Sequence, residues 1–428
     1  MEHLKIFKNT GYQIFTRVIT SGVGFITTII LARYLGVLGY GDFTKVTAFV
    51  GLFYLIADFG FNAVFLQKDT KTFPFKNLFF LRLAIALVLV FLVNGIAFLL
   101  PFNKVLNLGF SQSVRLGIMI FSLSIISQAI LFSSSAIFQK KLSYQNLAKS
   151  TAVGSLITLL LIAVFVFYSL PLSYFLWAFV IGGFISAIIS LILTREDINF
   201  FSRSEILLRS TNFAAIKRFF IESSPIGLML IFNLVYFRID IFLLSFLKST
   251  TDVGVYGLAY KFFDFLITLP LFLSNSIYPS LIVWQKNYRK LIRFSKIYVA
   301  VFLFVSIITL IVFWFLAPFI VLVKKEFFLS VLPFRILLLS LPLFFLTSIL
   351  QWILISQKQQ KFLMLIYSVC ASLNIILNII FIPIGSYIAS AIITGVSEFF
   401  VLLALAIRLI TVLPKLQGHE TVASPKGL

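Results

Sequence analysis

The sequence has little charge for its length and almost none of the residues on which metal or thiol chemistry depends. Only 11% of its 428 residues are charged, and it has one cysteine and two histidines, His3 and His419. A soluble domain would carry about 25% charged residues. The lone Cys370 excludes an intrachain disulfide and is best explained as a small buried residue. We therefore expect neither a metal nor a cofactor.

What the sequence does contain is long apolar runs, with apolar residues making up 61% of the chain. Runs of about 20 residues are long enough to cross a bilayer. A helix also satisfies its own backbone hydrogen bonds in hydrocarbon. The sequence therefore predicts an all-α polytopic membrane protein with twelve transmembrane helices. The expected spans are residues 11–33, 38–66, 78–100, 113–137, 147–168, 172–194, 219–248, 253–283, 291–316, 329–356, 360–382 and 385–411.

The basic residues are distributed unevenly between the two sides of the predicted bundle. Most of the 35 Lys and Arg residues lie in the termini and in the loops on the same side as the N-terminus. Because cytoplasmic loops of membrane proteins are enriched in Lys and Arg, both termini are predicted to be cytoplasmic. The net charge of +21 then reflects topology in a multi-pass cell-membrane (inner or plasma membrane) protein, and no nucleic-acid partner is expected. No signal-peptide cleavage site is visible before the first predicted helix.

The longest polar stretch divides the chain into two halves of six predicted helices. The predicted regions are an N-terminal bundle at 1–194, a basic cytoplasmic linker at 195–218, a C-terminal bundle at 219–411 and a cytoplasmic tail at 412–428.

The two halves resemble each other in sequence. The pattern Y-G-x-x-x-K begins at Tyr40 and again at Tyr256, and Gln139 followed by lysine has its counterpart at Gln357. Because six helices separate the matching positions, the halves share one orientation and form a parallel repeat. A substrate path between the two bundles is the natural expectation.

Polar side chains at helical spacing mark the helices expected to line this path. They occur on the first, second, seventh and eighth predicted helices, where burial of each charge costs about 2.5–3.5 kcal/mol on insertion scales. Small polar residues at such spacing also permit close helix packing, and carboxylates can bond neighbouring Thr or Tyr, so these alternatives stay open. The candidates for lining the cavity or coupling an ion are Lys45, Asp58, Asn233, Asp240 and Asp264.

Three basic residues within the predicted helices are candidates for binding an anionic group: Arg17, Arg238 and Lys261. Lys261 and Asp240 each lie about 12 Å below the outer ends of their helices, at about 1.5 Å per residue, and are expected to pair. The N-terminal half lacks an equivalent pair, so Lys45 is expected to be freer.

Three arginines near predicted span ends, Arg33, Arg82 and Arg115, are expected to extend their side chains to the membrane interface.

Two stretches resemble a known family. One runs from Arg238 through the segment 253–261 to Tyr278-Pro279, and the other runs from Ala32 through Tyr40-Gly41 to Asp58-Phe59-Gly60. They are similar to the O-antigen and polysaccharide flippases of the multidrug, oligosaccharidyl-lipid and polysaccharide (MOP) exporter superfamily. The resemblance implies two bundles, alternating access, and movement of a polyprenyl-pyrophosphate-linked oligosaccharide from the cytoplasmic to the outer leaflet. It places the protein in O-antigen-like or capsule-like polysaccharide biosynthesis.

Two other functions are weighed against this one. A multidrug antiporter of the same fold is the first alternative, although an exporter of cations would favour unpaired carboxylates, whereas basic groups here at least match the acidic ones. A membrane glycosyltransferase or polymerase needs a sizeable outer loop or an acidic catalytic cluster, and the predicted outer loops are short. We therefore expect a transporter and not an enzyme, with the bilayer, the lipid-linked oligosaccharide and other polysaccharide-assembly membrane proteins as partners.

Overall fold

The structure, a computed structural model, describes residues 2–67, 75–141, 143–195, 213–284 and 288–422. This part of the chain is almost entirely helical, and within it nine helices are long and apolar enough to cross a membrane. The prediction of an all-helical polytopic membrane fold is therefore confirmed. The chain divides into two compact units, residues 1–254 and 255–428, which we call unit 1 and unit 2 and describe separately.

The described part of unit 1 contains eight helices, a short hairpin and the first turn of a ninth helix. The elements are α1 (Glu2–Asp58), α2 (Phe61–Gln67), α3 (Phe75–Leu99), β1 (Phe102–Asn103), β2 (Leu108–Gly109), α4 (Gln112–Ser122), α5 (Ser124–Lys140), α6 (Tyr144–Phe167), α7 (Leu172–Thr194), α8 (Phe213–Leu247) and the start of α9 (Thr250–Trp284). The strands pair antiparallel, with Phe102 opposite Gly109.

Helix α1 is broken inside its 57 residues. Gly36 has non-helical dihedrals of φ 67° and ψ −176°, a conformation open to glycine because it has no Cβ. The break falls between the predicted spans 11–33 and 38–66. A second break separates α1 from α2, where Phe59 and Gly60 both have positive φ.

Small residues allow α6 and α7 to pack closely. A Cβ atom added to Gly154 would lie 1.8 Å from Ser186 Oγ, and one added to Gly182 would lie 1.9 Å from Thr158 Oγ1. Contacts this short require glycine on each helix. For these two helices, small polar residues at helical spacing serve packing, as the alternative interpretation of such stripes proposed.

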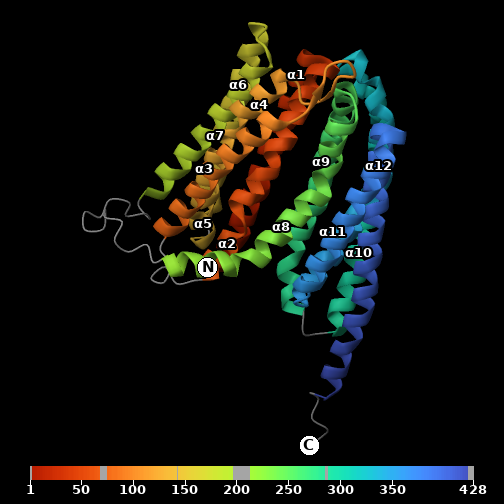
Figure 1. Cartoon of the computed structure of the whole chain (residues 1–428). Helices are drawn as coiled ribbons and strands as arrows, with labels where there is room; N and C mark the ends of the chain where they lie inside the picture. The colour runs from red at the N-terminus through yellow and green to blue at the C-terminus, as the bar shows by residue number, and fades with distance from the viewer. Residues whose placement is uncertain (1, 68–74, 142, 196–212, 285–287, 423–428) are drawn as a thin grey trace, which may run out of the picture. The chain divides into compact units, whose positions relative to one another are not determined.

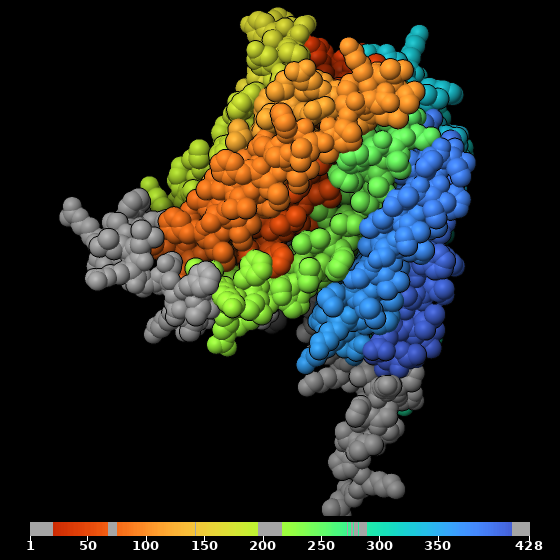
Figure 2. Space-filling view, in the orientation of Figure 1, coloured from red at the N-terminus to blue at the C-terminus, as the bar shows by residue number. Residues whose placement is uncertain are grey.

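Helix α8 belongs to unit 1 by its contacts. It packs against α1 and α2, and its yellow-green start lies against the red and orange helices of the same unit (Figures 1 and 2). Pro225 lies inside α8, which changes direction along its length in Figure 1. Contacts therefore divide the chain after Gly254, whereas the sequence placed the start of the second bundle at residue 219. The division of the transport fold into six-helix bundles stays a prediction.

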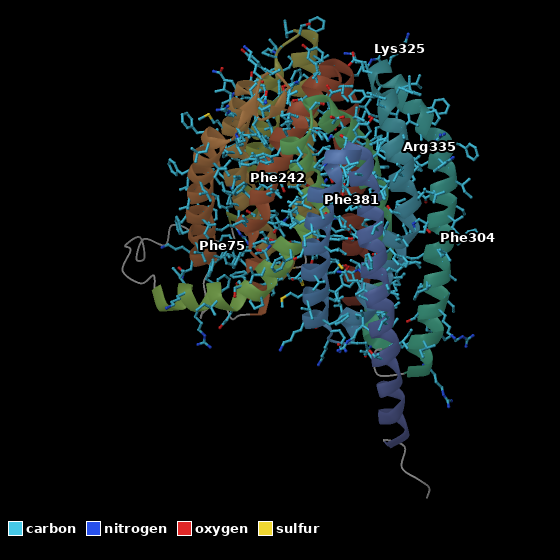
Figure 3. The ribbon with its side chains drawn as sticks, turned by 45° about the vertical axis from the view of Figure 1, so that its right-hand side comes forward. Phe75, Phe242, Phe304, Lys325, Arg335 and Phe381 are labelled. Carbon is cyan, nitrogen blue, oxygen red and sulfur yellow. The ribbon has the colours of Figure 1, made fainter. Side chains whose placement is uncertain are left out.

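Unit 2 contains the rest of α9 and three further long helices. Its elements are α10 (Tyr288–Leu316), η2 (Ala317–Leu322), η3 (Lys325–Ser330), α11 (Val331–Ser356) and α12 (Gln360–Val422). Helix α12 is broken at Ser386, with φ 49° and ψ −137°. Buried Phe302 and Phe345 join α10 to α11, whereas Phe304 is 66% exposed and points away from the bundle (Figure 3). Exposed aromatic residues on such helices suit contact with lipid.

Candidate transport site

The predicted site residues are distributed over three helices. Lys45 and Asp58 lie on α1, and Asn233, Arg238 and Asp240 lie on α8, all within unit 1. The other members lie elsewhere. Lys261 and Asp264 belong to α9 in unit 2, and Arg17 lies on α1 with its side chain outside the described part of the structure.

The residues of α8 and α9 differ in burial. Asp240 is 3% exposed, and its Oδ1 accepts a hydrogen bond from the Ile241 amide at 2.7 Å. Arg238 is half-buried, whereas Lys261 is exposed. The expected pair between Lys261 and Asp240 joins residues of different units and stays a prediction.

Lys45 is held firmly inside unit 1. Its side chain is 1% exposed, and Nζ donates to the Gly109 carbonyl at 2.6 Å and to Thr250 Oγ1 at 2.8 Å. The Thr250 amide also donates to the Asn107 carbonyl at 3.3 Å, so the ammonium group lies where α1, the hairpin and the start of α9 meet. The expectation that Lys45 would be freer is wrong, because distant segments supply oxygen acceptors that no local pattern reveals.

The backbones of α1 and α9 also approach closely beside Lys45. A Cβ atom on Gly41 would lie 2.1 Å from the Thr250 carbonyl oxygen, and one on Gly254 would lie 2.1 Å from the Val37 carbonyl oxygen. Only glycine fits at both positions without a shift of backbone. The hydrogen bonds of Lys45 therefore reinforce a helix crossing that already requires small residues.

Arg82 of α3 forms a buried ion pair with Asp58. The Arg82 side chain is 0% exposed, and NH2 donates to Asp58 Oδ1 at 2.9 Å and to Asn62 Oδ1 at 3.0 Å. Its guanidinium group also lies 5.6 Å from the centre of the Phe61 ring. The expectation that Arg82 extends to the interface is wrong, because a carboxylate and an amide oxygen are available inside the bundle. Asp58 and Arg82 lie near the same ends of neighbouring predicted spans. Opposite charges at similar depth in the sequence are the signal from which this pair could have been predicted.

The ion pair fixes the break between α1 and α2, which in turn contacts α8. The Phe59 ring stacks on Phe220 with centroids 4.7 Å apart, and a Cβ on Gly227 would lie 2.8 Å from the Phe59 ring. Arg82 NH2 also donates to the Asp58 carbonyl oxygen at 3.3 Å. Arg82 and Asp58 therefore orient the segment on which α8 rests, and ion coupling by Asp58 stays a prediction.

The arrangement suits binding and movement more than covalent chemistry. Among the described residues, there is no group of three or more His, Cys, Asp and Glu residues that could hold a metal ion. Lys45 and Arg82 direct their charges to oxygen atoms of unit 1, where they organise packing. Arg238 and Lys261 are two of the basic residues predicted to bind an anion, and this role stays a prediction.

Comparison with protein families identifies the chain. The profile of the polysaccharide biosynthesis proteins matches residues 6–282, well over half of the sequence. The chain belongs to this family. A second profile, named MatE, matches residues 225–380. The predicted resemblance to the polysaccharide exporters of the MOP superfamily is thereby confirmed.

Solved transporter structures share the fold of this family member. A lipid II flippase MurJ in an inward closed conformation is 16% identical, with a TM-score of 0.74 over 97% of this chain and 91% of its own. An inward-facing multidrug resistance MATE transporter is 10% identical, with a TM-score of 0.69 over 96% of each chain. A MOP superfamily transporter from Pyrococcus furiosus is 12% identical, with a TM-score of 0.62 over 95% of this chain and 96% of its own. Comparison with curated protein sequences gave no significant match.

These comparisons establish the general class. The protein is a multi-pass membrane protein of the polysaccharide biosynthesis family, and its fold is that of the solved MurJ and MATE structures.

Proposed function

We propose that this transporter is a flippase that moves a polyprenyl-pyrophosphate-linked oligosaccharide from the cytoplasmic to the outer leaflet by alternating access. The observation that carries the proposal is the match to the polysaccharide biosynthesis family over residues 6–282. The glycan is destined for a cell-surface polysaccharide of the O-antigen or capsule type. A pyrophosphate group is recognised by charged hydrogen-bond donors, and the sugars by hydroxyl, amide and aromatic groups.

The chain crosses the membrane twelve times in this proposal, with both termini in the cytoplasm. The breaks at Gly36 and Ser386 divide α1 and α12 into two spans each, and α4 and α5 together form one apolar stretch, Gln112–Lys140. The uneven distribution of Lys and Arg supports the orientation. An accessibility reporter at Arg289 should therefore react only from the cytoplasmic side, and reaction from outside contradicts the topology.

The anionic head group is bound by Arg17, Arg238 and Lys261 in this proposal. Asn233, Asp240 and Asp264 line the same path, and Lys45 and Asp58 support it from unit 1. Support comes from the cost of placing Arg238 and Lys261 within helices α8 and α9, which favours a role that requires their charge.

Reconstitution tests the function directly. Proteoliposomes are loaded with a fluorescent polyprenyl-pyrophosphate oligosaccharide, and movement between leaflets is measured by the access of an external glycosidase. The protein should accelerate movement, and Arg238→Ala and Arg17→Ala should abolish it while the protein still inserts at near-normal levels. Lys104→Ala, which changes an exposed lysine, is the matched control. Unchanged movement in both arginine variants contradicts the proposed pyrophosphate site.

A multidrug antiporter is the second candidate, favoured by the MatE match over residues 225–380. The same proteoliposomes distinguish the two functions, because an antiporter extrudes organic cations and leaves the labelled glycolipid where it is.

A further inference from the structure

The first turns of α10 carry a row of basic side chains on one face. Arg289, Arg293 and Lys296 are all exposed. They are four and three residues apart, the spacing at which side chains follow one another along one face of an α-helix. Lys290 is exposed as well, but it lies about 100° around the helix from Arg289. We call the row formed by the first three residues the basic strip of α10.

The basic strip has no acidic neighbour on its own helix. Residues 288–316 contain neither Asp nor Glu, and the acidic residues nearest in the sequence are Asp264 on α9 and Glu326 on η3. Glu326 follows the far end of α10 and lies 3.5 Å from Lys324. Within the described part of the chain, none of the three side chains of the strip forms an ion pair. Their charges are therefore available to an anion outside the protein.

The same face of α10 continues as an exposed apolar stripe. Phe304 lies on this stripe and points away from the bundle (Figure 3). On the opposite face of the helix, Phe302 is buried and its ring packs against Phe345 of α11. Exposed apolar side chains on a helix long enough to cross a membrane suit contact with acyl chains. The stripe begins one turn after Lys296 and consists of Ala300, Phe304, Ile307, Ile311 and Phe315.

The basic strip and the start of the apolar stripe match the length of one phospholipid molecule. From Lys296 to Ile307 the helix rises about 16 Å at about 1.5 Å per residue. One leaflet of the hydrocarbon core is about 15 Å thick, half of the whole core. Acyl chains can therefore extend along the stripe while the phosphate group stays at the strip. Arg293 suits the phosphate because a guanidinium group can donate two parallel hydrogen bonds to it.

We propose that this face of α10 binds an anionic phospholipid of the bilayer, with its phosphate on the basic strip and its acyl chains on the apolar stripe. Basic residues at the membrane end of a helix attract anionic lipids. The excess of basic residues that sets topology requires no particular face of a helix, whereas here the basic and apolar residues are aligned. A second copy on the same face would place basic groups opposite basic groups, since a symmetric contact uses the same patch twice. The site goes beyond the proposed function, because this lipid is bound and not transported.

Lipid titration followed by native mass spectrometry tests the basic strip. Phosphatidylglycerol or phosphatidylcholine is added to the purified full-length protein in detergent, and bound lipids are counted. The wild type should prefer phosphatidylglycerol. Arg293→Gln combined with Lys296→Gln should bind it about thirtyfold more weakly, from the attraction that two basic groups exert on an anionic lipid.

The matched control removes the same charge elsewhere in unit 2. Lys358, in the turn before α12, and Lys361, in its first turn, are exposed. Lys358→Gln combined with Lys361→Gln should bind phosphatidylglycerol like the wild type. Wild-type binding by the α10 variant, or an equal loss in both double variants, overturns the site.

A photoreactive side chain tests the position of the acyl chains. p-Benzoylphenylalanine is placed at Phe304 or, as the matched control, at Phe315, which lies on the same stripe about 16 Å further along the helix. In membranes that contain both lipids, illumination should couple phosphatidylglycerol to position 304 above its share of the bilayer. Coupling at position 315 should follow that share. Coupling in proportion to the bilayer at both positions overturns the docking of a whole lipid.

The mass of the protein extracted from its own membrane distinguishes the other occupants. The lipid that remains bound should have the mass of an anionic glycerophospholipid. A polyprenyl pyrophosphate in its place assigns the site to the carrier lipid, and a dimer that the Arg293 and Lys296 double variant loses assigns this face to a second copy. Either result overturns the proposal. None of these measurements involves transport, so failure of the wild type to move the labelled glycolipid contradicts the proposed function and leaves the lipid site standing.

Discussion

Units 1 and 2 each place a carboxyl group between apolar helices, half-buried at Asp58 and buried at Glu398, and they surround it with different partners. Asp58 in unit 1 lies 2.9 Å from the guanidinium group of Arg82, whereas Glu398 in unit 2 contacts the hydroxyl of Thr347. An opposite charge compensates a carboxylate inside a bundle, whereas a hydroxyl group contributes a hydrogen bond without a full charge. The comparison separates an ion pair that fixes a helix break in unit 1 from a hydrogen bond that joins two long helices in unit 2.

The largest effect is expected from breaking the ion pair of unit 1. Arg82→Ala leaves the half-buried Asp58 carboxylate without its opposite charge, and the loss of one partner of a fully buried pair, about 3–5 kcal/mol, sets the upper bound of the cost. The thermal unfolding midpoint of the purified protein in detergent should fall strongly. Arg33→Ala, at an exposed arginine of the same unit, is the control.

A double variant sharpens this contrast. Arg82→Leu combined with Asp58→Asn removes both charges and should recover part of the stability that Arg82→Leu alone loses. If Arg82→Ala and wild-type protein unfold at the same temperature, the pair contributes nothing and the distinction between the two units fails.

A smaller loss is expected at Lys45. Lys45→Met keeps the length of the side chain but removes the charged hydrogen bonds to Gly109 and Thr250, each of which contributes about 1.5–3 kcal/mol. Thr250→Val removes one of these acceptors and should cost less. Unfolding of the purified variants measures both effects, and Lys104→Met, at an exposed lysine of the same unit, should unfold like the wild type. Equal stability of Lys45→Met and Lys104→Met contradicts the role assigned to Lys45.

The next largest loss of stability is expected at the glycine contact beside Lys45. Gly41→Ala brings a Cβ within 2.1 Å of the Thr250 carbonyl oxygen, and such overpacking costs about 1–3 kcal/mol. Gly51→Ala on the same helix meets nothing within 4 Å and should be neutral or stabilise by up to about 1 kcal/mol. Thermal unfolding of the two alanine variants distinguishes them, and a similar response at both positions contradicts a tight crossing.

The smallest effect is expected from the predicted pair between Lys261 and Asp240. If Lys261 and Asp240 interact, a double-mutant cycle of transport rates should give a coupling of at least about 0.5 kcal/mol, with either single alanine variant impaired more than the double variant. If the effects of the two single variants simply add in the double variant, the pair does not form. A coupling also places an acidic residue of unit 1 beside a basic residue of unit 2.

The helical class was accessible from the sequence because a bilayer imposes a length and an apolar composition on each span. The break at Gly36 falls between two predicted spans, whereas the break at Phe59-Gly60 lies inside the predicted span 38–66 and was not predicted. The grouping of α8 with unit 1 could not be predicted, because it depends on side chains such as Phe59 and Phe220 meeting across the chain.

The candidate site was accessible only in part. The sequence identified Lys45 and Asp58 as unusual charges within helices, but it assigned neither of them its partner. Hydropathy reports how unfavourable a buried charge is, and it contains no information on the direction in which a side chain points. Arg82 was assigned to the interface for this reason, although its partner lies 24 residues away.

The sequence by itself determined that this chain is a helical membrane protein of the polysaccharide biosynthesis family, since hydrophobic length and short motifs are local properties of the chain. Only the tertiary structure decided which charges are paired, as it does for Arg82 and Asp58. Thr347 and Glu398 are 51 residues apart, and their hydrogen bond forms only because the fold packs α11 against α12. Electrostatic interactions in a medium of low polarity depend on these short distances, and packing alone sets them.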